Sequence, residues 1–560
     1  MPPIADTFET ALAHHRAGRI AVAATLYRTI LARAPDDEFP EAHNHLGIAL
    51  QQLGRLGDAA AAFERALALK PDYHEAQYNL GNLRRAEGDL PAAMAAFRRA
   101  IALRPDAPEA HNNLGNALQQ AGRLVEARAC YERALALRPT HTSALNNLGN
   151  VCRAEGKLAE ARALFERALA LKPAYADAHN NLAITLRLDG RFADALVHYD
   201  RAVALTPNAA GPLNNRGNLL QDLGRLDEAA ASFEQALAIE PEFPAAHHNL
   251  GMALLAAGRF EAGWREYEWR WRIPHAADPA RRFGAPSWRG EPSTDGTLLL
   301  HAEQGFGDTL QFCRYAPLLA GRGHRIVLEV PPALVRLMRS LEPRIDVVAQ
   351  GDALPPFDHH CPLLSLPLAC GTRLRSIPSN GPYLAADPTA QELWRRRLAA
   401  DGAPLKVGLV WSGNPRADRP DLAAIDRRRS IAADLLAPLT ACPGVRFYSL
   451  QQQGDPAASR LGLVDVMAEM TDFADTAALV ANLDLVIAVD TAVAHLAGAL
   501  GRPVWLLNRF DSCWRWLARR DDSPWYPTLR LFRQTQPGDW AGVVARVGRA
   551  LEALSAGMSR

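Results

Sequence analysis

Small, apolar and turn-forming residues recur along the first half of the chain at a constant step of 34 residues. A glycine followed by a charged residue marks each period, and a proline keeps the same step from Pro71 to Pro241. The glycines are Gly54, Gly88, Gly122, Gly156, Gly190, Gly224 and Gly258. A constant step of this length predicts a stack of similar units, each packing against its neighbours.

Further positions keep the same period. A small residue stands where two helices approach each other closely, at Gly47, Gly81, Gly115, Gly149, Ala183, Gly217 and Gly251. An aromatic residue follows 16 positions later, from Phe63 to Tyr267. These residues resemble the tetratricopeptide repeat, a 34-residue helix-turn-helix unit, in about eight copies over residues 4–272. The resemblance implies a superhelical α-solenoid over residues 1–272.

Asparagines form a further periodic set, on the side of the array expected to be concave. They are Asn79, Asn113, Asn147, Asn181, Asn215 and Asn249. Two interpretations stay open. The amides line a groove and bond the backbone of an extended peptide without reading its sequence, or they bond within the repeats themselves.

The eighth unit departs from the pattern. Arg270 replaces a small residue, and Trp264, Tyr267 and Trp271 fall on one helical face. A terminal repeat has to cover its open apolar face. We therefore expect these aromatic side chains to dock on the following domain rather than to stack on a ligand.

The second half alternates short apolar runs with helical segments. Residues 273–296 are rich in proline, glycine and arginine and indicate a linker. The expected strands are 297–301, 325–330 and 345–348 in a first lobe (297–385), and 406–411, 446–450, 484–489, 503–507 and 529–532 in a second (386–560). This alternation predicts two Rossmann-like lobes with parallel sheets, a GT-B-type α/β fold. A final helix from about residue 539 is expected to cross back onto the first lobe.

Residues 297–320 open the first lobe with a strand, a glycine turn and a helix. Gly305 and Gly307 allow a tight turn and the close approach of a ligand to the backbone. Asp308 falls in the first helical turn, so it is either a helix cap or a catalytic carboxylate at the mouth of the sheet. The secondary candidates at this mouth, which otherwise only pack the loop, are His301, Glu303 and Gln304.

A loop of the second lobe favours a bound diphosphate. Directly after a strand come Trp411, Ser412, Gly413 and Asn414, and shortly afterwards Arg427, Arg428 and Arg429. A glycine turn with arginines suits a diphosphate, which needs backbone donors and compensating positive charge.

A second loop of the same lobe also indicates a phosphate-binding site. A buried strand ends at Asp490, Thr491 and Ala492 open a helix, and His495 lies one turn in. The free N–H groups at a helix N-terminus can hold phosphates. Taken singly, these residues also fit an ordinary helix cap and a core histidine.

Composition excludes several functions. The 62 basic residues balance 61 acidic ones, so nothing indicates a nucleic-acid partner or an anionic membrane surface. Seven cysteines without paired spacing argue against a zinc site or disulfides and fit a reducing compartment. With no signal-peptide pattern and no apolar run of about 18 residues, we expect a cytoplasmic protein without a membrane span.

Residues 305–308 together with residues 490–495 resemble glycosyltransferase family 9, the ADP-heptose:lipopolysaccharide heptosyltransferases, and the similarity covers residues 297–535. The resemblance implies inverting, metal-independent sugar transfer without a cofactor, with Asp308 as base and the second motif holding the nucleotide sugar. Ala492 stands where that family has glycine, and one arginine of 427–429 stands in for its lysine if any residue does. The order of repeats and transferase also resembles the protein O-linked N-acetylglucosamine transferases and the bacterial repeat-containing glycosyltransferases.

The sequence thus predicts a glycosyltransferase that moves a sugar from a nucleotide-diphosphate donor to an acceptor hydroxyl, on a protein held in the repeat groove. Two alternatives remain open. One is a binding scaffold with a degenerate transferase half, and the other is a transferase that acts on a glycolipid or polysaccharide.

Overall fold

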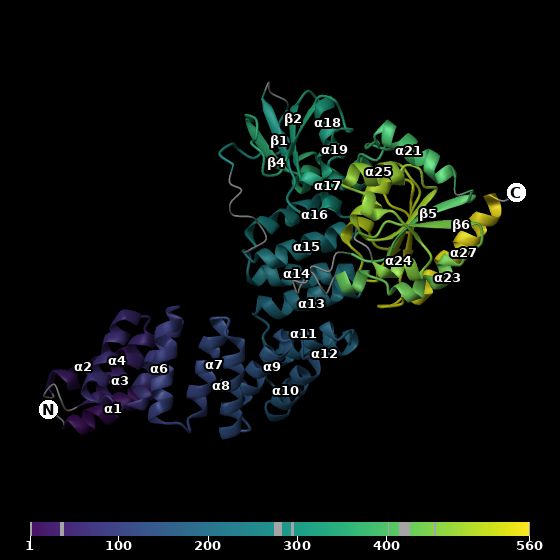
Figure 1. The fold of residues 1–560 in the computed structure, drawn as a ribbon. Coiled ribbons are helices and arrows are strands. Elements are labelled where there is room, and N and C mark those ends of the chain that lie inside the picture. Colours follow the sequence, from purple (N-terminus) through teal and green to yellow (C-terminus); the bar gives the residue numbers. More distant parts are fainter. Residues whose placement is uncertain are drawn as a thin grey trace. The chain divides into compact units, whose positions relative to one another are not determined.

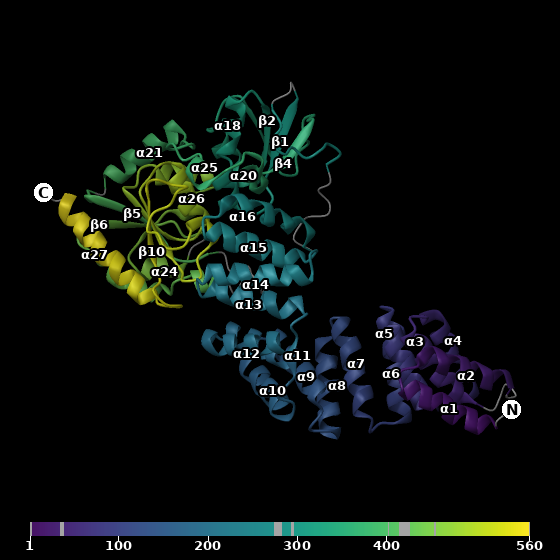
Figure 2. The same ribbon diagram turned by 180° about the vertical axis from the view of Figure 1, so that it is seen from behind.

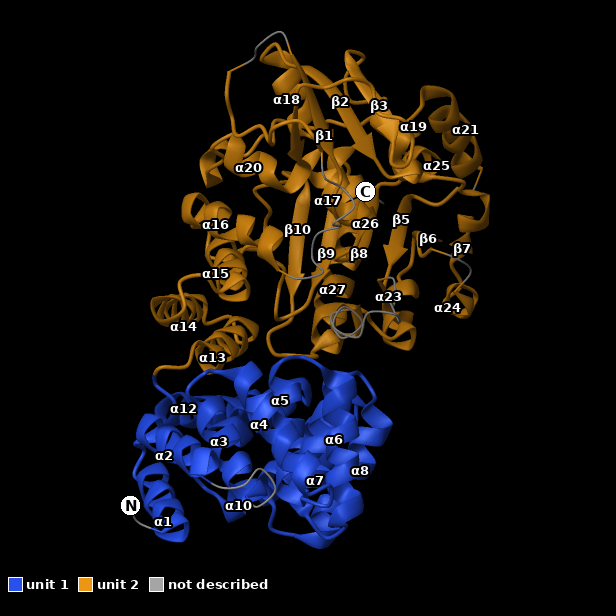
Figure 3. Ribbon diagram, turned by 90° about the vertical axis from the view of Figure 1, so that its left-hand side faces the viewer, with its two compact units in different colours: residues 1–207 blue, residues 208–560 orange. Residues whose placement is uncertain are grey.

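The computed structural model describes residues 3–33, 39–273, 283–292, 296–400, 402–413, 426–452 and 455–558. The chain forms two compact units, residues 1–207 and residues 208–560 (Figure 3). The array predicted over residues 1–272 is therefore divided, because its last two helix pairs belong to the unit that contains the α/β half.

Unit 1 consists of helical hairpins stacked in chain order. Its helices are α1 (Ile4–Arg16), α2 (Ile20–Arg33), α3 (Pro40–Gln52), α4 (Leu56–Leu69), α5 (His74–Ala86), α6 (Leu90–Leu103), α7 (Pro108–Gln120), α8 (Leu124–Leu137), α9 (Thr142–Ala154), α10 (Leu158–Leu171), α11 (Ala176–Leu188) and α12 (Phe192–Leu205). The periodic glycines between paired helices, such as Gly54 with φ of 75°, adopt the left-handed conformation that glycine tolerates best.

Five glycines of the pattern lie against a buried aromatic ring of the paired helix: Gly47, Gly81, Gly115, Gly149 and Gly217. A Cβ built on Gly115 would lie 2.6 Å from the ring of Tyr131, and one built on Gly81 would lie 2.7 Å from the ring of Phe97. Side chains never approach this closely without displacement. The glycine and the aromatic residue therefore form one packing unit that recurs along the array.

Unit 2 begins with the last repeats, α13 (Ala210–Asp222), α14 (Leu226–Ile239), α15 (Pro244–Ala256) and α16 (Phe260–Tyr267), which Figures 1 and 2 show stacked in order. The 3-10 helix η1 (Glu268–Arg272) follows them. The predicted docking of the terminal aromatics is confirmed for Trp264 and Tyr267, which are 2% and 4% exposed. It is wrong for Trp271, which is 38% exposed, because the switch from α-helix to 3-10 helix after Tyr267 turns this side chain to another face.

The first lobe has a four-stranded parallel sheet in the order β3-β2-β1-β4. Its strands are β1 (Thr297–His301), β2 (Arg325–Val330), β3 (Ile345–Ala349) and β4 (His359–Pro362). Its helices are α17 (Phe306–Phe312), α18 (Tyr315–Gly321), α19 (Val335–Met338) and α20 (Leu366–Ala369), with 3-10 turns η2 (Pro332–Leu334), η3 (Leu363–Ser365) and η4 (Leu374–Ser376).

The second lobe has a six-stranded parallel sheet in the order β10-β9-β8-β5-β6-β7. Its strands are β5 (Leu405–Val410), β6 (Val445–Ser449), β7 (Val464–Asp465), β8 (Leu485–Val489), β9 (Val504–Asn508) and β10 (Leu529–Arg533). Its helices are α21 (Pro388–Ala399), α23 (Ala437–Thr440), α24 (Pro456–Arg460), α25 (Phe473–Val480), α26 (Ala492–Ala499) and α27 (Trp540–Met558), with 3-10 turns η5 (Ala433–Leu436), η6 (Met467–Glu469) and η7 (Trp514–Trp516).

The predicted strands agree with the structure to within one residue, and both sheets are parallel as expected. Three features differ. Strands β4 and β7 were not predicted, since β4 is rich in histidine and β7 has two residues. Residues 286–288 of the predicted linker run beside β4, where the backbone N–H of Trp288 donates to the carbonyl of His360 at 2.8 Å.

The final helix corrects a further expectation. The buried face of this helix does not pack on the first lobe. Instead α27 packs on β10 and α23, and Val543, Val547 and Leu551 join the core of the second lobe. In the described ranges no helix has both the length and the apolarity required to cross a bilayer.

Candidate functional site

The sequence motifs follow strands at the points where the strand order of each sheet reverses. In the first lobe β1 lies between β2 and β4, and in the second β5 lies beside β8. Ligands of doubly wound sheets bind at the carboxyl ends of such strands. Three segments directly follow the carboxyl ends of strands: residues 302–308 after β1, residues 411–413 after β5 and residues 490–491 after β8. The candidate residues therefore stand where this fold binds ligands.

The two motifs meet because α17 of the first lobe packs on α26 of the second. A Cβ built on Gly307 would lie 3.0 Å from Cδ2 of His495 and 3.8 Å from Cα of Ala492. Gly305, the residue before α17, has an ordinary φ of −66°. The glycine turn thus serves close packing between the lobes, and it joins the two predicted motifs into one site.

Asp308 lies in the first turn of α17, where the helix dipole favours a carboxylate. Its Oδ1 forms an ion pair with Nη2 of Arg515, from the turn η7. The side chain of Asp308 is 21% exposed and that of Arg515 is 10% exposed. A partly exposed carboxylate at this position can accept a proton from an incoming hydroxyl.

His495 is enclosed between the lobes. Its Nδ1 lies 2.9 Å from the hydroxyl oxygen of Tyr526, and its ring stacks on Trp516 with centroids 5.1 Å apart. Burial lowers the pKa of His495 to about 3, so the ring is neutral at neutral pH. Its Nε2 lies 3.9 Å from Oδ1 of Asp490. This neutral ring packs between the lobes and supplies no positive charge to a phosphate.

Arg429 connects the two predicted loops of the second lobe. Its Nη1 donates to the backbone carbonyl of Asp490 at 3.0 Å, and its Nη2 forms an ion pair with Asp426. Gly413 packs directly against the guanidinium, where a Cβ would collide with it. The Nε of Arg429 is buried without a hydrogen-bond partner in the described structure. The turn after β5 and the end of β8 are therefore held together by one arginine.

Thr491 precedes the first residue of α26, Ala492, without capping the helix by its side chain. Its hydroxyl donates to the carbonyl of Val489 at 3.2 Å. The first N–H groups of a helix have no intrahelical acceptor. The N-terminus of α26 can therefore present backbone donors to an anion.

The side chain of Trp411 and the backbone of Ser412 are bonded within the second lobe. Trp411 is 2% exposed, and its Nε1 donates to Asp455 at 3.1 Å, so its ring belongs to the core. The backbone N–H of Ser412 donates to Gln451 at 3.1 Å. Of the remaining arginines, Arg428 is paired with Asp511 at 2.9 Å and Arg427 is exposed. Asn414 lies outside the described residues.

The secondary candidates at the end of β1 differ in their contacts. Glu303 binds Arg270 of η1 through both of its carboxylate oxygens, at 2.9 and 3.0 Å, and accepts from the backbone N–H of Leu364 at 3.1 Å. It ties the terminal repeat to the first lobe. His301 Nε2 lies 3.3 Å from His360 Nδ1, and Gln304 is exposed.

The asparagine ladder is bonded to the array itself. Amide nitrogens donate to side chains of the preceding repeat at 2.8–3.1 Å, from Asn79 to Asn44, Asn113 to Tyr78 and Asn82, Asn147 to Asn112, Asn181 to Asn146 and Asn249 to Asn214. Asn215 also has an interaction partner. These bonds occupy the amide N–H groups within the array. They favour the interpretation in which the asparagine donors bond within the repeats rather than to a peptide.

Sequence reasoning missed the loop between β9 and β10, residues 509–528. This loop supplies Arg515 to Asp308 and Tyr526 to His495. The run Trp514-Arg515-Trp516 is conspicuous because two tryptophans flank an arginine. No motif links it to Asp308, which lies 207 positions earlier in the chain.

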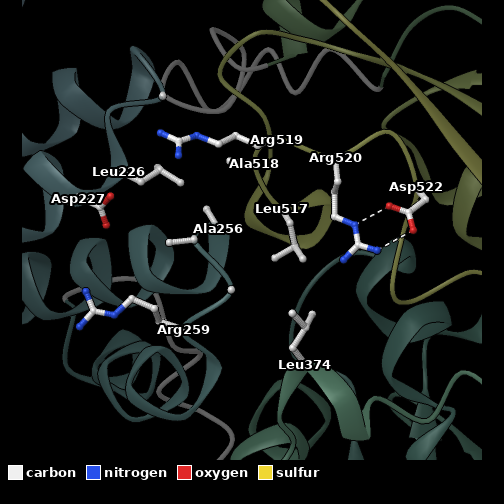
Figure 4. Close-up of a pocket in the computed structure, with 13 residues that line it drawn as sticks. Leu226, Asp227, Ala256, Arg259, Leu374, Leu517, Ala518, Arg519, Arg520 and Asp522 are labelled. Atoms are coloured by element: carbon white, nitrogen blue, oxygen red, sulfur yellow. Dashed lines mark hydrogen bonds and ion pairs between the residues drawn. The ribbon is translucent and has the colours of Figure 1, made fainter.

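A cavity of about 580 Å³ lies against the same loop (Figure 4), and no residue of either motif is among those that line it. Arg259, Leu517 and Arg519 line it, and Arg520 is paired with Asp522 at its edge. This cavity therefore does not mark the candidate site. Among the described residues no group of three or more histidines, cysteines or carboxylates is arranged to hold a metal ion.

Comparisons with known families support the two halves separately. Models described as tetratricopeptide repeat or TPR repeat match residues 40–73, 81–122, 106–174, 143–208 and 217–258. The model described as glycosyltransferase family 9 (heptosyltransferase) matches residues 457–507, a segment that contains β8 and α26. The first half of the chain therefore carries tetratricopeptide repeats, and part of the second lobe is similar to family 9.

Individual proteins match the chain only in part. Protein FlbA of Caulobacter vibrioides (strain CB 15) is 30% identical over 327 residues, which are 52% of this chain and 52% of that protein. The chain thus spans about half the length of this curated relative. Solved structures with some likeness include the APC/C hetero-tetramer Cut9-Hcn1 (21% identity, TM-score 0.40, 44% of this chain and 48% of that chain) and Pseudomonas aeruginosa PilF (24%, 0.34, 38% and 96%).

Proposed function

We propose that the chain is a glycosyltransferase that moves a sugar from a nucleotide-diphosphate donor to an acceptor hydroxyl. The observation that carries this proposal is the contact of Gly307 with His495, by which a motif from each lobe enters one site. The family 9 match over residues 457–507 supports the donor side of this site.

The donor would bind at the carboxyl ends of β5 and β8. There the N-terminus of α26 offers backbone N–H groups and Arg429 offers a largely buried guanidinium. Fixed donors in a partly enclosed site stabilise the negative charge that grows on a departing diphosphate. The buried Nε of Arg429, which has no partner among the described residues, is a further donor at this edge.

The acceptor hydroxyl would be activated by Asp308. In the proposed step the hydroxyl oxygen forms a bond to the anomeric carbon of the sugar, and its proton passes to the carboxylate of Asp308. The bond between that carbon and the diphosphate oxygen breaks, and its electron pair leaves with the nucleoside diphosphate. Attack from the face opposite the leaving group inverts the configuration at that carbon.

The acceptor class is proposed from the repeats. Tetratricopeptide repeats indicate protein interaction, and we infer a polypeptide acceptor bound by them. In unit 1 a pocket of about 370 Å³ is lined by polar side chains, Arg85, Asn116, Gln119, Gln120 and Asn147. Such side chains offer both donors and acceptors to a peptide backbone.

Asp308→Asn tests the function. The amide keeps the shape of the side chain but cannot take the proton, so turnover should fall by about 10²–10⁴-fold. Donor affinity, measured by titration with the nucleotide sugar, should change little. Asp352→Asn removes the same charge at an exposed turn of the first lobe and should leave turnover unchanged. Full activity of the Asp308→Asn variant would reject the assignment of the base.

A further inference from the structure

We propose that Arg515 is the positioning residue for Asp308 and that the terminal repeat holds Arg515 in place. The proposal rests on the transferase function proposed above and adds a residue, and a structural element, that neither the motifs nor the family 9 match includes.

The guanidinium of Arg515 contacts several side chains within the site. Its Nη2 pairs with Asp308, its Nε donates to Oε1 of Gln311 at 2.9 Å, and its Nη1 lies 3.2 Å from Sγ of Cys513. The guanidinium also lies over the ring of Trp514, 4.4 Å from its centroid. A planar guanidinium bound at several points fixes its partner more strictly than a mobile cation does. Asp308 is therefore oriented by its contact with Arg515.

The loop that carries Arg515 has a strained backbone. Leu517 and Arg519 have φ of 50° and 60°, a region that residues with a side chain rarely adopt. Two groups secure this conformation. Nη2 of Arg533 donates to the carbonyls of Trp516 and Leu517 at 2.6 Å, and the backbone N–H of Ala518 donates to the carbonyl of Ala256 at 2.9 Å. Ala256 is the last residue of α15, so the terminal repeat supports this loop directly.

The aromatic side chains of α16 pack against the residue next to Arg515. The ring of Trp264 meets that of Trp514 edge to face at 5.2 Å, and Tyr267 meets it at 6.0 Å. Nε1 of Trp264 also donates to the carbonyl of Thr372 in the first lobe, at 3.1 Å. The terminal repeat thus contacts the first lobe and the loop of the second lobe at once.

These contacts form a continuous path from α16 through Trp514 and Arg515 to Asp308. Trp264, Trp514 and Arg515 are buried, and the path ends at the partly exposed carboxylate of Asp308. Because a small displacement of a reacting group costs much of the rate, the orientation of Asp308 depends on this path. The terminal repeat is then a structural part of the catalytic site, in addition to its place in the binding array.

The first test is a set of kinetic measurements on Arg515→Gln, Asp308→Asn and the double variant. Arg515→Gln should lower kcat by about 100-fold while KM and the binding of the nucleotide sugar change little. The double variant should be no slower than Asp308→Asn alone, since Arg515 acts through Asp308. Arg515→Lys should recover part of kcat, because it restores the charge without the fork.

Three outcomes would overturn the proposal. If Arg515→Gln lowers kcat by the same factor in the presence of Asp308→Asn, Arg515 does not act through Asp308. If it weakens donor binding and leaves kcat unchanged, Arg515 is a donor ligand. If the wild-type chain transfers no sugar from any donor, the proposed function fails, and the role of Arg515 fails with it. Should Arg515→Gln not fold, Arg515→Lys must still lower kcat without changing donor binding.

The second test distinguishes loss of the contact path to Asp308 from a general loss of stability of the terminal repeat. Trp264→Leu removes the contact with Trp514 and should lower kcat, with donor binding retained. Trp269→Leu is the matched control, because Trp269 belongs to the same repeat but stacks on His247 at 3.7 Å. Equal kcat values for the two variants would contradict the role of the terminal repeat.

Discussion

At the scale of single residues, the candidate site depends on close packing as much as on charge. Gly307 allows His495 and Ala492 to approach, and Gly413 allows the guanidinium of Arg429 to approach. The sequence predicts that Gly307 admits a ligand and that the turn at Gly413 suits a diphosphate, but in the structure the missing side chains of both glycines admit protein groups. A motif read from sequence therefore locates such a glycine correctly without identifying what approaches it.

The burial of His495 has a consequence for stability. Its pKa falls from the ordinary 6.5 to about 3, so below pH 6.5 the unfolded chain takes up a proton that the folded chain does not. Folding stability is lost as pH falls from 6.5 toward 3, by up to about 1.4 kcal/mol per pH unit from this residue. His495→Gln should therefore lose up to about 2 kcal/mol less than the wild type between pH 6.5 and pH 5.

Urea denaturation followed by tryptophan fluorescence measures this effect, because all 11 tryptophans lie in residues 208–560. The comparison is made between the two proteins at each pH, so that other titrating groups cancel. Equal losses of stability in the wild type and in His495→Gln would show that the folded state protonates this ring readily.

The polar residues that complete the site could be predicted only in part. Asp308, Asp490 and Thr491 follow strands, and the sequence pattern is sufficient to place them at the carboxyl edges of two sheets. Arg515 and Tyr526 could not be placed, since their contacts depend on how the loop between β9 and β10 folds against α16 and α17. Tertiary packing of an irregular loop leaves no periodic signal.

At the scale of elements, the repeat is defined by a glycine and an aromatic ring in contact. Gly115→Ala would place a Cβ 2.6 Å from the ring of Tyr131, which is buried. We expect a loss of about 1–3 kcal/mol in the stability of unit 1, because the ring has to move. Ala183 occupies the same position in another repeat, so the lower end of this range is expected.

Thermal unfolding followed by circular dichroism measures the cost of Gly115→Ala. Gly57→Ala is the matched control, since a Cβ on Gly57, within α4, meets no atom within 4 Å. This control should be neutral or stabilised by about 0.5–1 kcal/mol, because alanine favours helix. A Gly115→Ala variant as stable as the control would contradict the packing account.

Strands and helices with strong periodicity were predictable because their own side chains define them. Strand β1 shows this, since its apolar run predicted the observed bounds, residues 297–301. Strand β4 was missed because histidines fill it and its order comes from pairing with β1. The direction in which α27 packs was also not predictable, since an amphipathic helix does not specify which apolar surface it covers.

At the scale of the whole molecule, the boundary between compact units does not follow the boundary between repeat and α/β sequence. Helices α13 to α16 belong to the unit that contains the α/β half. Arg270 and Glu303 form a buried ion pair across the sequence boundary, with side chains 5% and 8% exposed. Removing one member of such a pair leaves an uncompensated charge.

Two fragments test this division. A fragment of residues 208–560 keeps the pair and the aromatic contacts with Trp514 and should unfold cooperatively. A fragment of residues 273–560 lacks Arg270 and Trp264 and should be less stable by at least about 3–5 kcal/mol or fail to fold. Thermal unfolding of the purified fragments gives the answer. A shorter fragment as stable as the longer one would show that the terminal repeats are dispensable to the α/β half.

The measurement that tests the account most directly is a thermal-shift panel of nucleoside diphosphates and their sugars on the full chain, with and without magnesium. A ligand at 100 times its Kd stabilises its binding lobe by about 2.7 kcal/mol. The account predicts that nucleotides with one particular base raise the melting temperature, and that Asp308→Asn retains this shift. No shift with any nucleotide would contradict a donor site and would favour a protein-binding scaffold.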